Sequence, residues 1–258
     1  MIVGLYSSAS GMLAEASRHE AIANNLANVS TIGFKQDTTV IRQSSAQLLH
    51  RLSDNLFRFD TMTADLAPAV GSRGLGAVVE NIIPNFQQGQ LLETGGRYDL
   101  AIQGDGWFMV QTPRGRRFTR AGDFAVDVRG RLVTMAGDPV LSSTGAEIVP
   151  GNRRLEINRN GMIFFDGEES GRIGVMVPES PEMLVKEGES LFSQAPGARM
   201  RDAGAEVVQG SVERSNVNPI LGMVEMLEAL RAYESNQRAI LAQDETLGRL
   251  INEVGRFG

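Results

Sequence analysis

The sequence offers few side chains whose types and spacing could carry out catalysis or bind a metal. It contains no cysteine and only two histidines, His19 and His50, so disulfides, thiolate metal sites and cysteine nucleophiles are excluded. Neither histidine has a metal-ligand neighbour at helical spacing, and we expect His19 to pack as a neutral imidazole. Carboxylates such as Asp123 and Asp127 lie in strand or turn patterns, with nothing to indicate a dry cleft that would separate their pKa values. We therefore expect no catalytic residue, no metal site and no enzyme activity.

A short glycine motif and a basic cluster are the remaining candidates for ligand binding. Gly104-Asp105-Gly106 resembles part of a phosphate-binding loop, but a β pattern follows it rather than the helix that would bind an anion. We expect a turn there and no bound cofactor. Four arginines also lie close together in the sequence: Arg114, Arg116, Arg117 and Arg120. The whole chain carries a net charge of −6, which argues against a nucleic-acid partner.

The chain shows no signal for membrane insertion. No apolar run approaches the roughly 20 residues that a spanning helix needs. The first residues, MIVGLYSSASGML, contain no basic residue, and no charge appears before Glu15, so they make a poor cleavable signal peptide. If the protein leaves the cytoplasm, we expect it to do so without a cleaved signal.

The elements that dominate the sequence are two amphipathic helices at its ends. Residues 5–29 carry apolar or small residues at alternating steps of four and three, which is the 3.5-residue period of a coiled-coil seam. The seam consists of Leu5, Ala9, Met12, Ala16, His19, Ala23 and Leu26. Gly33 provides a left-handed stop after this helix.

The second helix is predicted over residues 219–254. It begins at Asn218-Pro219, a capping side chain followed by a proline that a first helical turn tolerates. Its apolar stripe consists of Met223, Met226, Leu227, Leu230, Tyr233, Ile240, Leu247, Leu250, Ile251 and Val254. Two such helices far apart in the sequence favour association with other subunits, although the same pattern would suit a helix pair packed on one ordinary domain.

Between the helices the pattern is β-rich. Residues 36–78 are polar and weakly periodic, and we expect an extended connector there. Short strand patterns with turn residues then predict an all-β domain over residues 79–210, either a sandwich or a partial barrel. Arg129-Gly130 and Asn160-Gly161 mark two expected hairpins. The predicted fold class is α+β, with an inner domain built from residues 1–35 and 211–258 as a paired, coiled-coil-like helical unit.

Four segments carry a resemblance to a known family. They are NNLANVSTIGFK (24–35), DLAIQGDGWFMVQ (99–111), FTRAGDFAVDVRGRLV (118–133) and SNVNPILGMVEMLEALRAYESNQRAI (215–240). They resemble the bacterial flagellar rod and hook proteins. The resemblance implies a structural subunit of the rod in the flagellar basal body, exported uncleaved by the flagellar export apparatus, with copies of itself and other axial proteins as partners. In that family the terminal helices form an inner coiled-coil tube and the β domain faces outward.

Within the family, the compact length and the stretch GDPVLSSTGAEIVP (137–150) look more like a proximal-rod subunit, with a distal-rod subunit as the alternative. A hook protein is disfavoured, because it generally carries an additional outer domain. An alternative of another class is a soluble β-rich carbohydrate-binding module, but only 6% of the residues are aromatic. The expected assembly interface lies on the helices and the signature after the first of them: Leu5, Met12, Ile22, Asn25, Leu26, Asn28, Phe34, Met223, Leu227, Leu230, Tyr233, Ile240 and Leu247.

Overall fold

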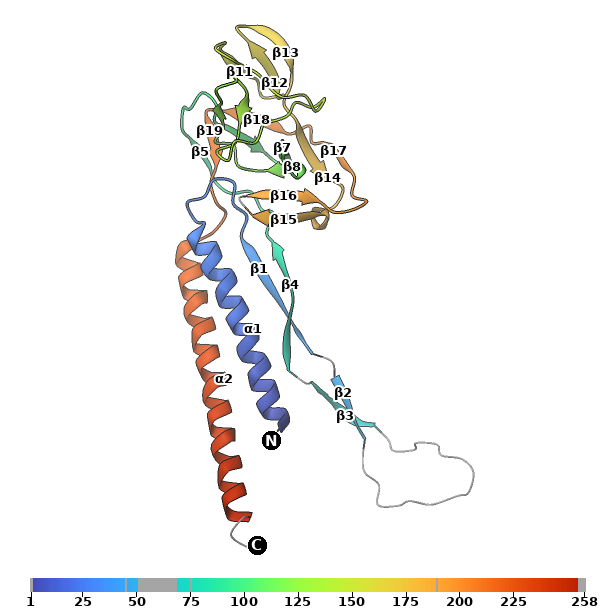
Figure 1. Cartoon of the computed structure of the whole chain (residues 1–258), viewed down its shortest axis with the longest axis vertical. Helices are drawn as coiled ribbons and strands as arrows, with labels where there is room; N and C mark the ends of the chain where they lie inside the picture. The colour runs from blue at the N-terminus through green and yellow to red at the C-terminus, as the bar shows by residue number, and fades with distance from the viewer. Residues whose placement is uncertain (1, 45, 51–68, 75, 189, 255–258) are drawn as a thin grey trace, which may run out of the picture. The chain divides into compact units, whose positions relative to one another are not determined.

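The computed structural model describes residues 2–44, 46–50, 69–74, 76–188 and 190–254. Helix α1 (Ile2–Ala27) opens the described chain and helix α2 (Pro219–Val254) ends it, with strands between them (Figure 1). This arrangement confirms the α+β class with a central β-rich region. The chain divides into two compact units, which are described separately: residues 1–23, 38–83 and 223–258 form unit 1, and residues 24–37 and 84–222 form unit 2.

The strands of the described part follow one another at short intervals. In chain order they are β1 (Asp37–Gln43), β2 (Ala46–His50), β3 (Ala69–Gly74), β4 (Ala77–Pro84), β5 (Leu91–Glu93), β6 (Leu100–Gln103), β7 (Trp107–Thr112), β8 (Gly115–Thr119), β9 (Ala125–Val126), β10 (Leu132–Val133), β11 (Leu155–Ile157), β12 (Met162–Phe165), β13 (Glu168–Arg172), β14 (Val175–Pro178), β15 (Leu184–Gly188), β16 (Leu191–Gln194), β17 (Met200–Asp202), β18 (Glu206–Gln209) and β19 (Ser211–Glu213). A single 3-10 turn, Pro181–Met183, precedes β15.

Helix α2 begins where its sequence predicts. The Asn218 side-chain oxygen accepts hydrogen bonds from the amides of Ile220 and Leu221, at 3.1 and 3.2 Å. These bonds satisfy two of the amide groups that the first turn of any helix leaves without a partner. Helix α1 ends at Ala27 rather than at residue 29, and Gly33 has the expected positive φ of 66°.

In unit 1, α1 and α2 approach each other at two glycines of α1. A Cβ atom built on Gly4 would lie 2.9 Å from the side-chain nitrogen of Gln243, and one built on Gly11 would lie 3.0 Å from that of Asn236. From the first contact to the second, the position on α1 rises by seven residues, from 4 to 11, and the position on α2 falls by seven, from 243 to 236. The two helices are therefore antiparallel here. The glycines leave room for the two amide side chains.

Unit 1 also contains strands in the range predicted as an extended connector. β1 pairs with β4, and β2 pairs antiparallel with β3; residues 51–68 lie outside the described part of the chain. The β1–β4 pair carries large apolar side chains on its surface, including Ile41, Val78 and Ile82. A two-stranded ribbon without a buried face has little reason to alternate apolar and polar residues, which is why its sequence showed no strand periodicity.

The sheets of unit 2 are small and antiparallel where their register is defined. The largest has six strands in the order β15-β16-β8-β7-β14-β17, and β11-β12-β13 form a three-stranded sheet. β18 pairs with β6, and β19 pairs with β5. An aromatic cluster of Phe86, Trp107 and Phe192 packs on the six-stranded sheet, with Trp107 and Phe192 ring centres 4.6 Å apart.

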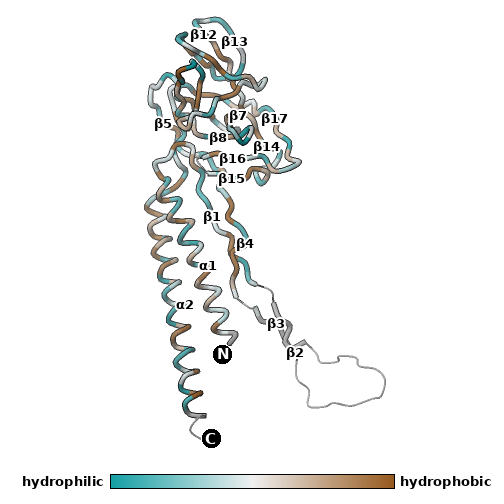
Figure 2. Tube along the Cα trace, in the orientation of Figure 1, coloured by the Kyte–Doolittle hydropathy of each residue, from teal (hydrophilic) through white to brown (hydrophobic). Residues whose placement is uncertain are grey.

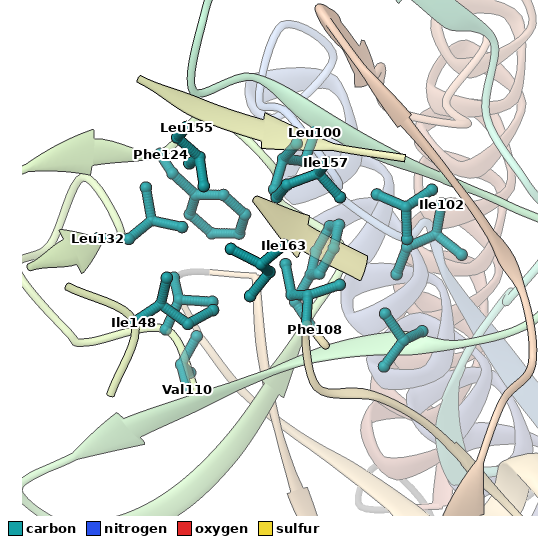
Figure 3. Packing of buried hydrophobic residues seen from close by; sticks show 14 of the residues in the cluster. Leu100, Ile102, Phe108, Val110, Phe124, Leu132, Ile148, Leu155, Ile157 and Ile163 are labelled. Carbon is teal, nitrogen blue, oxygen red and sulfur yellow. The ribbon is translucent and has the colours of Figure 1, made fainter. Parts of the chain in front are cut away.

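The main core of unit 2 collects aliphatic side chains from many of these short strands (Figure 3). Leu100, Phe108 and Leu132 are fully buried in it, and Phe108 meets Phe124 edge-to-face with ring centres 5.2 Å apart. Each such side chain contributes about 1.5–3 kcal/mol on burial. The β domain therefore has a core of its own.

Both predicted hairpins are confirmed, and they use the same turn. β9 pairs with β10 and β11 pairs with β12, while Gly130 and Gly161 take positive φ angles of 77° and 76°. In the first turn the Asp127 side chain accepts from the amides of residues 129 and 131, at 2.9 Å each. Asn158 does the same for residues 160 and 162 in the second turn. These loops are longer than the two-residue loops that the dipeptides suggested, because each glycine occupies a left-handed position after a local turn.

Candidate functional site

The apolar side chains predicted on α2 are largely exposed in the single chain. Met223, Leu227 and Leu230 have 54%, 56% and 44% of their surface exposed, and Tyr233 and Ile240 are half-buried. Leu247 is half-buried as well. Figure 2 shows the resulting mixture of apolar and polar residues along this helix. An apolar stripe of this length is typical of an interaction surface.

The predicted residues of α1 are more covered. Leu5, Met12 and Leu26 are half-buried and Ile22 is buried. No member of the predicted seam is fully buried; the buried alanines are Ala14 and Ala21 instead. The buried alanines therefore lie off the seam expected from the sequence, and the two glycines that approach α2 are half-buried.

The end of α1 and the segment after it, residues 24–37, are joined through an asparagine. The Asn25 side chain donates to the backbone oxygen of Asp37 and accepts from its amide, both at 2.8 Å. Asn28 donates to Asn24 at 2.8 and 3.0 Å. The sequence placed Asn25 and Asn28 at an interface with neighbours, but the structure satisfies the Asn25 amide within the chain.

Phe34 is also engaged within unit 2. It is buried, and the ammonium group of Lys186 lies 3.9 Å from the centre of its ring. The same ammonium donates to the backbone oxygen of Lys35 and to the carboxylate of Asp37, at 2.9 Å each. The apolar side chain expected to contact a neighbour is thus packed under a lysine of its own chain.

Three buried charges of unit 2 meet at this segment. The Lys35 ammonium donates to Glu213 Oε1 at 2.7 Å, and the Arg120 guanidinium donates to Glu213 Oε2 at 3.1 Å. All three side chains are at most 4% exposed. We call these residues, Lys35, Arg120 and Glu213, the buried triad.

Backbone groups supply further hydrogen bonds to the buried triad. Glu213 Oε1 accepts from the amide of Gly89 at 2.9 Å, and Lys35 donates to the backbone oxygen of Gln87 at 2.8 Å. Burial lowers the pKa of Lys35 and Glu213 opposes that shift. Burial also lowers the pKa of Arg120, and Glu213 again opposes the shift. A buried charge needs such a set of partners, because an unpaired one is costly.

A second side chain joins the two ends of the chain at this place. Asn216 accepts from the amide of Gln36 at 2.8 Å and donates to the backbone oxygens of Asn85 and Gln87, at 2.8 and 3.0 Å. The Gly33 amide also donates to the backbone oxygen of Glu213, at 2.7 Å. The segment that follows α1 and the segment that precedes α2 are thereby bonded to each other, and Asn216 also bonds the backbone of residues 85 and 87.

Sequence reasoning did not identify the buried triad. Lys35 was quoted only as a letter of a family-like segment, Arg120 was named only as a member of the basic cluster, and Glu213 lies just outside one of those segments. One signal was available: Glu213 is the charged residue of a short β pattern, Ser211-Val212-Glu213, that otherwise suits a buried strand. A charge in such a strand requires a partner of opposite charge.

The pKa values of Asp123 and Asp127 shift in opposite directions, although the sequence indicated nothing that would separate them. Burial raises the pKa of half-buried Asp123, helped by the nearby carboxylate of Asp99. Hydrogen bonds from the Arg131 amide and its neighbours lower the pKa of Asp127.

Among the residues that the structure describes, no three His, Asp or Glu side chains gather as a metal site. None of the described helices is long and apolar enough to cross a membrane.

Known families match both ends and the middle of the chain. The family described as "Flagella basal body rod protein" matches residues 5–35, "Flagellar hook protein FlgE/F/G D1 domain" matches residues 101–165, and "Flagellar basal body rod FlgEFG protein C-terminal" matches residues 208–253. Each of the three matched regions contributes one residue of the buried triad.

Curated relatives match nearly the full length. The flagellar basal-body rod protein FlgF of Caulobacter vibrioides is 32% identical over 242 residues, covering 92% of each chain. The flagellar hook-basal body complex protein FlhO of Bacillus subtilis is 30% identical and covers 100% of each chain. FlgG of Buchnera aphidicola subsp. Schizaphis graminum, also a basal-body rod protein, is 32% identical and covers 97% of this chain and 99% of its own. This chain belongs to the family of flagellar basal-body rod proteins.

Proposed function

We propose that this member of the rod family polymerises through its terminal helices, with itself and with other axial proteins, into the drive shaft of the flagellar basal body. The observation that carries the proposal is the exposed apolar stripe of α2, in which Met223, Leu227 and Leu230 are about half exposed in the single chain. Contact with neighbouring subunits would remove this surface from water. The hydrophobic effect would then favour assembly.

The helices pair within the subunit as a coiled-coil-like unit in this proposal. The approach of Gln243 to Gly4 and of Asn236 to Gly11 supports it, because both contacts repeat after seven residues. A seven-residue repeat is the signature of coiled coils, and a buried amide at such a position specifies the register of the two helices. The expected inner domain of residues 1–35 and 211–258 rests on this pairing.

The proposed interface consists of the exposed and half-buried members of the predicted set: Leu5, Met12, Leu26, Asn28, Met223, Leu227, Leu230, Tyr233, Ile240 and Leu247. Ile22, Asn25 and Phe34 are assigned a different task, because they are buried within the chain. We infer that these three hold the end of α1 in place so that the exposed residues can meet a neighbour.

The position within the rod is proposed to be proximal. The stretch at residues 137–150 supports this position. The relatives of the chain include proteins named FlgF and FlgG alike. We also propose export through the flagellar export apparatus without a cleaved signal, and a purely mechanical role with no catalysis. A distal position is the alternative outcome of the test.

The test is incorporation of epitope-tagged protein into basal bodies of a strain that lacks the native copy. Gold labelling of partly assembled rods, arrested by deletion of later axial proteins, would locate the subunit. The proposal expects label on the shortest rods that form. Label only on full-length rods would indicate a distal subunit, and label absent from purified basal bodies would contradict the proposal altogether.

A further inference from the structure

The buried triad places one carboxylate between two buried cations. In the described part of the chain, Glu213 is the sole carboxylate that forms an ion pair with Lys35 or with Arg120. The two cations precede it by 178 and 93 residues. While residue 213 has not yet docked on the β domain, Lys35 and Arg120 are already part of the chain but lack their ion-pair partner.

Without the Glu213 carboxylate, the closed arrangement would bury Lys35 and Arg120 beside each other with no ion-pair partner, and only the carboxylate of Asp105 would still act on Arg120. Their positive charges already oppose one another, since Arg120 contributes to lowering the pKa of Lys35. Buried charges that lose their partner are strongly destabilising. The local structure around Lys35 would then open to let water reach the ammonium group.

We propose that Glu213 acts as a latch: once the segment preceding α2 has docked, its carboxylate pins residues 33–37 to the β domain, and those residues stay open until then. The end of α1 is thus set in place only in a chain whose C-terminal arm is already seated. This conditional order is a property of the single subunit and does not depend on the proposed assembly into a rod.

The contacts of Glu213 explain why opening would be local. Its carboxylate bonds Lys35, Arg120 and the Gly89 amide, and its backbone oxygen bonds the Gly33 amide. Its strand, β19, pairs with β5 alone, outside the six-stranded sheet. Arg120 is held independently of Glu213 by bonds to the backbone oxygens of Ile102 and Gly104, at 3.4 and 2.7 Å, and Ile102 belongs to the main hydrophobic core. The latch can therefore release without unfolding that core.

Hydrogen exchange on the full chain tests the latch through Glu213→Gln, which keeps the shape of the side chain and removes its charge. The Gly33 amide bonds the backbone oxygen of Glu213 and the Gly89 amide bonds its side chain. Both amides should exchange about tenfold faster or more, because the uncompensated charges of Lys35 and Arg120 favour the open state. Two core amides, Met109 bonded to Gly174 and Leu141 bonded to Met109, should stay within twofold of the unchanged protein. Equal acceleration at all these amides would overturn the proposal, as would no acceleration at any of them.

Two further variants keep the test decisive if Glu213→Gln folds poorly. Glu187→Gln is the matched control, because Glu187 pairs with Arg117 at 2.9 Å near the surface and should leave the exchange of Gly33 and Gly89 unchanged. Lys35→Met added to Glu213→Gln removes one of the uncompensated cations, and it should recover at least part of the lost protection. Failure of this double variant to recover any protection would show that uncompensated charge does not drive the opening.

Discussion

The exposed stripe of α2 leads to a sharp prediction for Leu230→Asp. Leu230 is 44% exposed in the single chain, so the aspartate side chain can point into water and the subunit should fold normally. In the assembled rod the same position would be covered by a neighbour. The substitution should therefore block assembly while leaving the free subunit stable.

The expected size of the effect follows from the exposed surface. Full burial of a leucine side chain is worth about 1.5–3 kcal/mol, so covering the exposed 44% of Leu230 is worth roughly 1 kcal/mol. The aspartate loses this term and adds the cost of burying an unpaired carboxylate, which is several kcal/mol. Because 1.4 kcal/mol is a factor of about ten in an equilibrium constant, each contact should weaken at least a hundredfold.

The assay is complementation of a strain that lacks the protein, with swimming and the presence of the subunit in purified basal bodies as readouts. Arg231→Asp is the matched control: it introduces the same side chain one position along, at an exposed residue off the apolar stripe. Arg231→Asp should swim and Leu230→Asp should not. Normal incorporation of Leu230→Asp, or an equal failure of both variants, would refute the assignment of the stripe.

Three further predictions concern the β domain and the segment after α1. Asn25→Ala removes both side-chain bonds to residue 37 and should lower the free energy of unfolding by about 1–3 kcal/mol, measured by chemical denaturation; an unchanged midpoint would contradict the intramolecular role. Gly33→Ala should lower the thermal midpoint more than Gly137→Ala: both have positive φ, but only at Gly33 would the new Cβ meet backbone, 2.2 Å from the amide nitrogen of residue 121. The folded-state pKa of Asp127 is lowered by its turn hydrogen bonds, so its stabilisation of the β9–β10 hairpin is present above its unfolded pKa of about 3.9 and is lost as the pH falls through the lowered value. NMR of that hairpin should show acid sensitivity that Asp127→Asn removes, and equal acid sensitivity in the variant would be the contrary result.

Much of the fold could be predicted because its signals are local. The start of α2 follows from Asn218 and Pro219, and the two hairpins follow from turn dipeptides. Strand β1 escaped prediction because it lacks a buried face to impose alternation, whereas most of β4 lies in the range predicted as β structure. The face of α1 that approaches α2 was not predicted, because it contains Gly4 and Gly11, which have no apolar side chain and so add nothing to a hydrophobic pattern. Amide side chains from a distant helix approach them.

Of the candidate site, only the exposed apolar stripe of α2 could be predicted from the sequence. The stripe of α2 could be recognised from spacing, because its residues repeat on one helix. The buried triad could not, because Lys35, Arg120 and Glu213 are brought together by contacts between residues up to 178 positions apart. Likewise, the partner of the Asn25 amide is the backbone of residue 37, and no side-chain pattern announces a backbone partner. Burial of Phe34 under Lys186 is a third contact of this long-range kind.

The most direct measurement is electron cryo-microscopy of basal bodies that contain this protein, at a resolution that shows side chains. The account predicts that Met223, Leu227 and Leu230 lie against neighbouring axial subunits and that the triad stays closed within each subunit. A map in which these three side chains of α2 face solvent, while another surface makes the subunit contacts, would contradict the central claim.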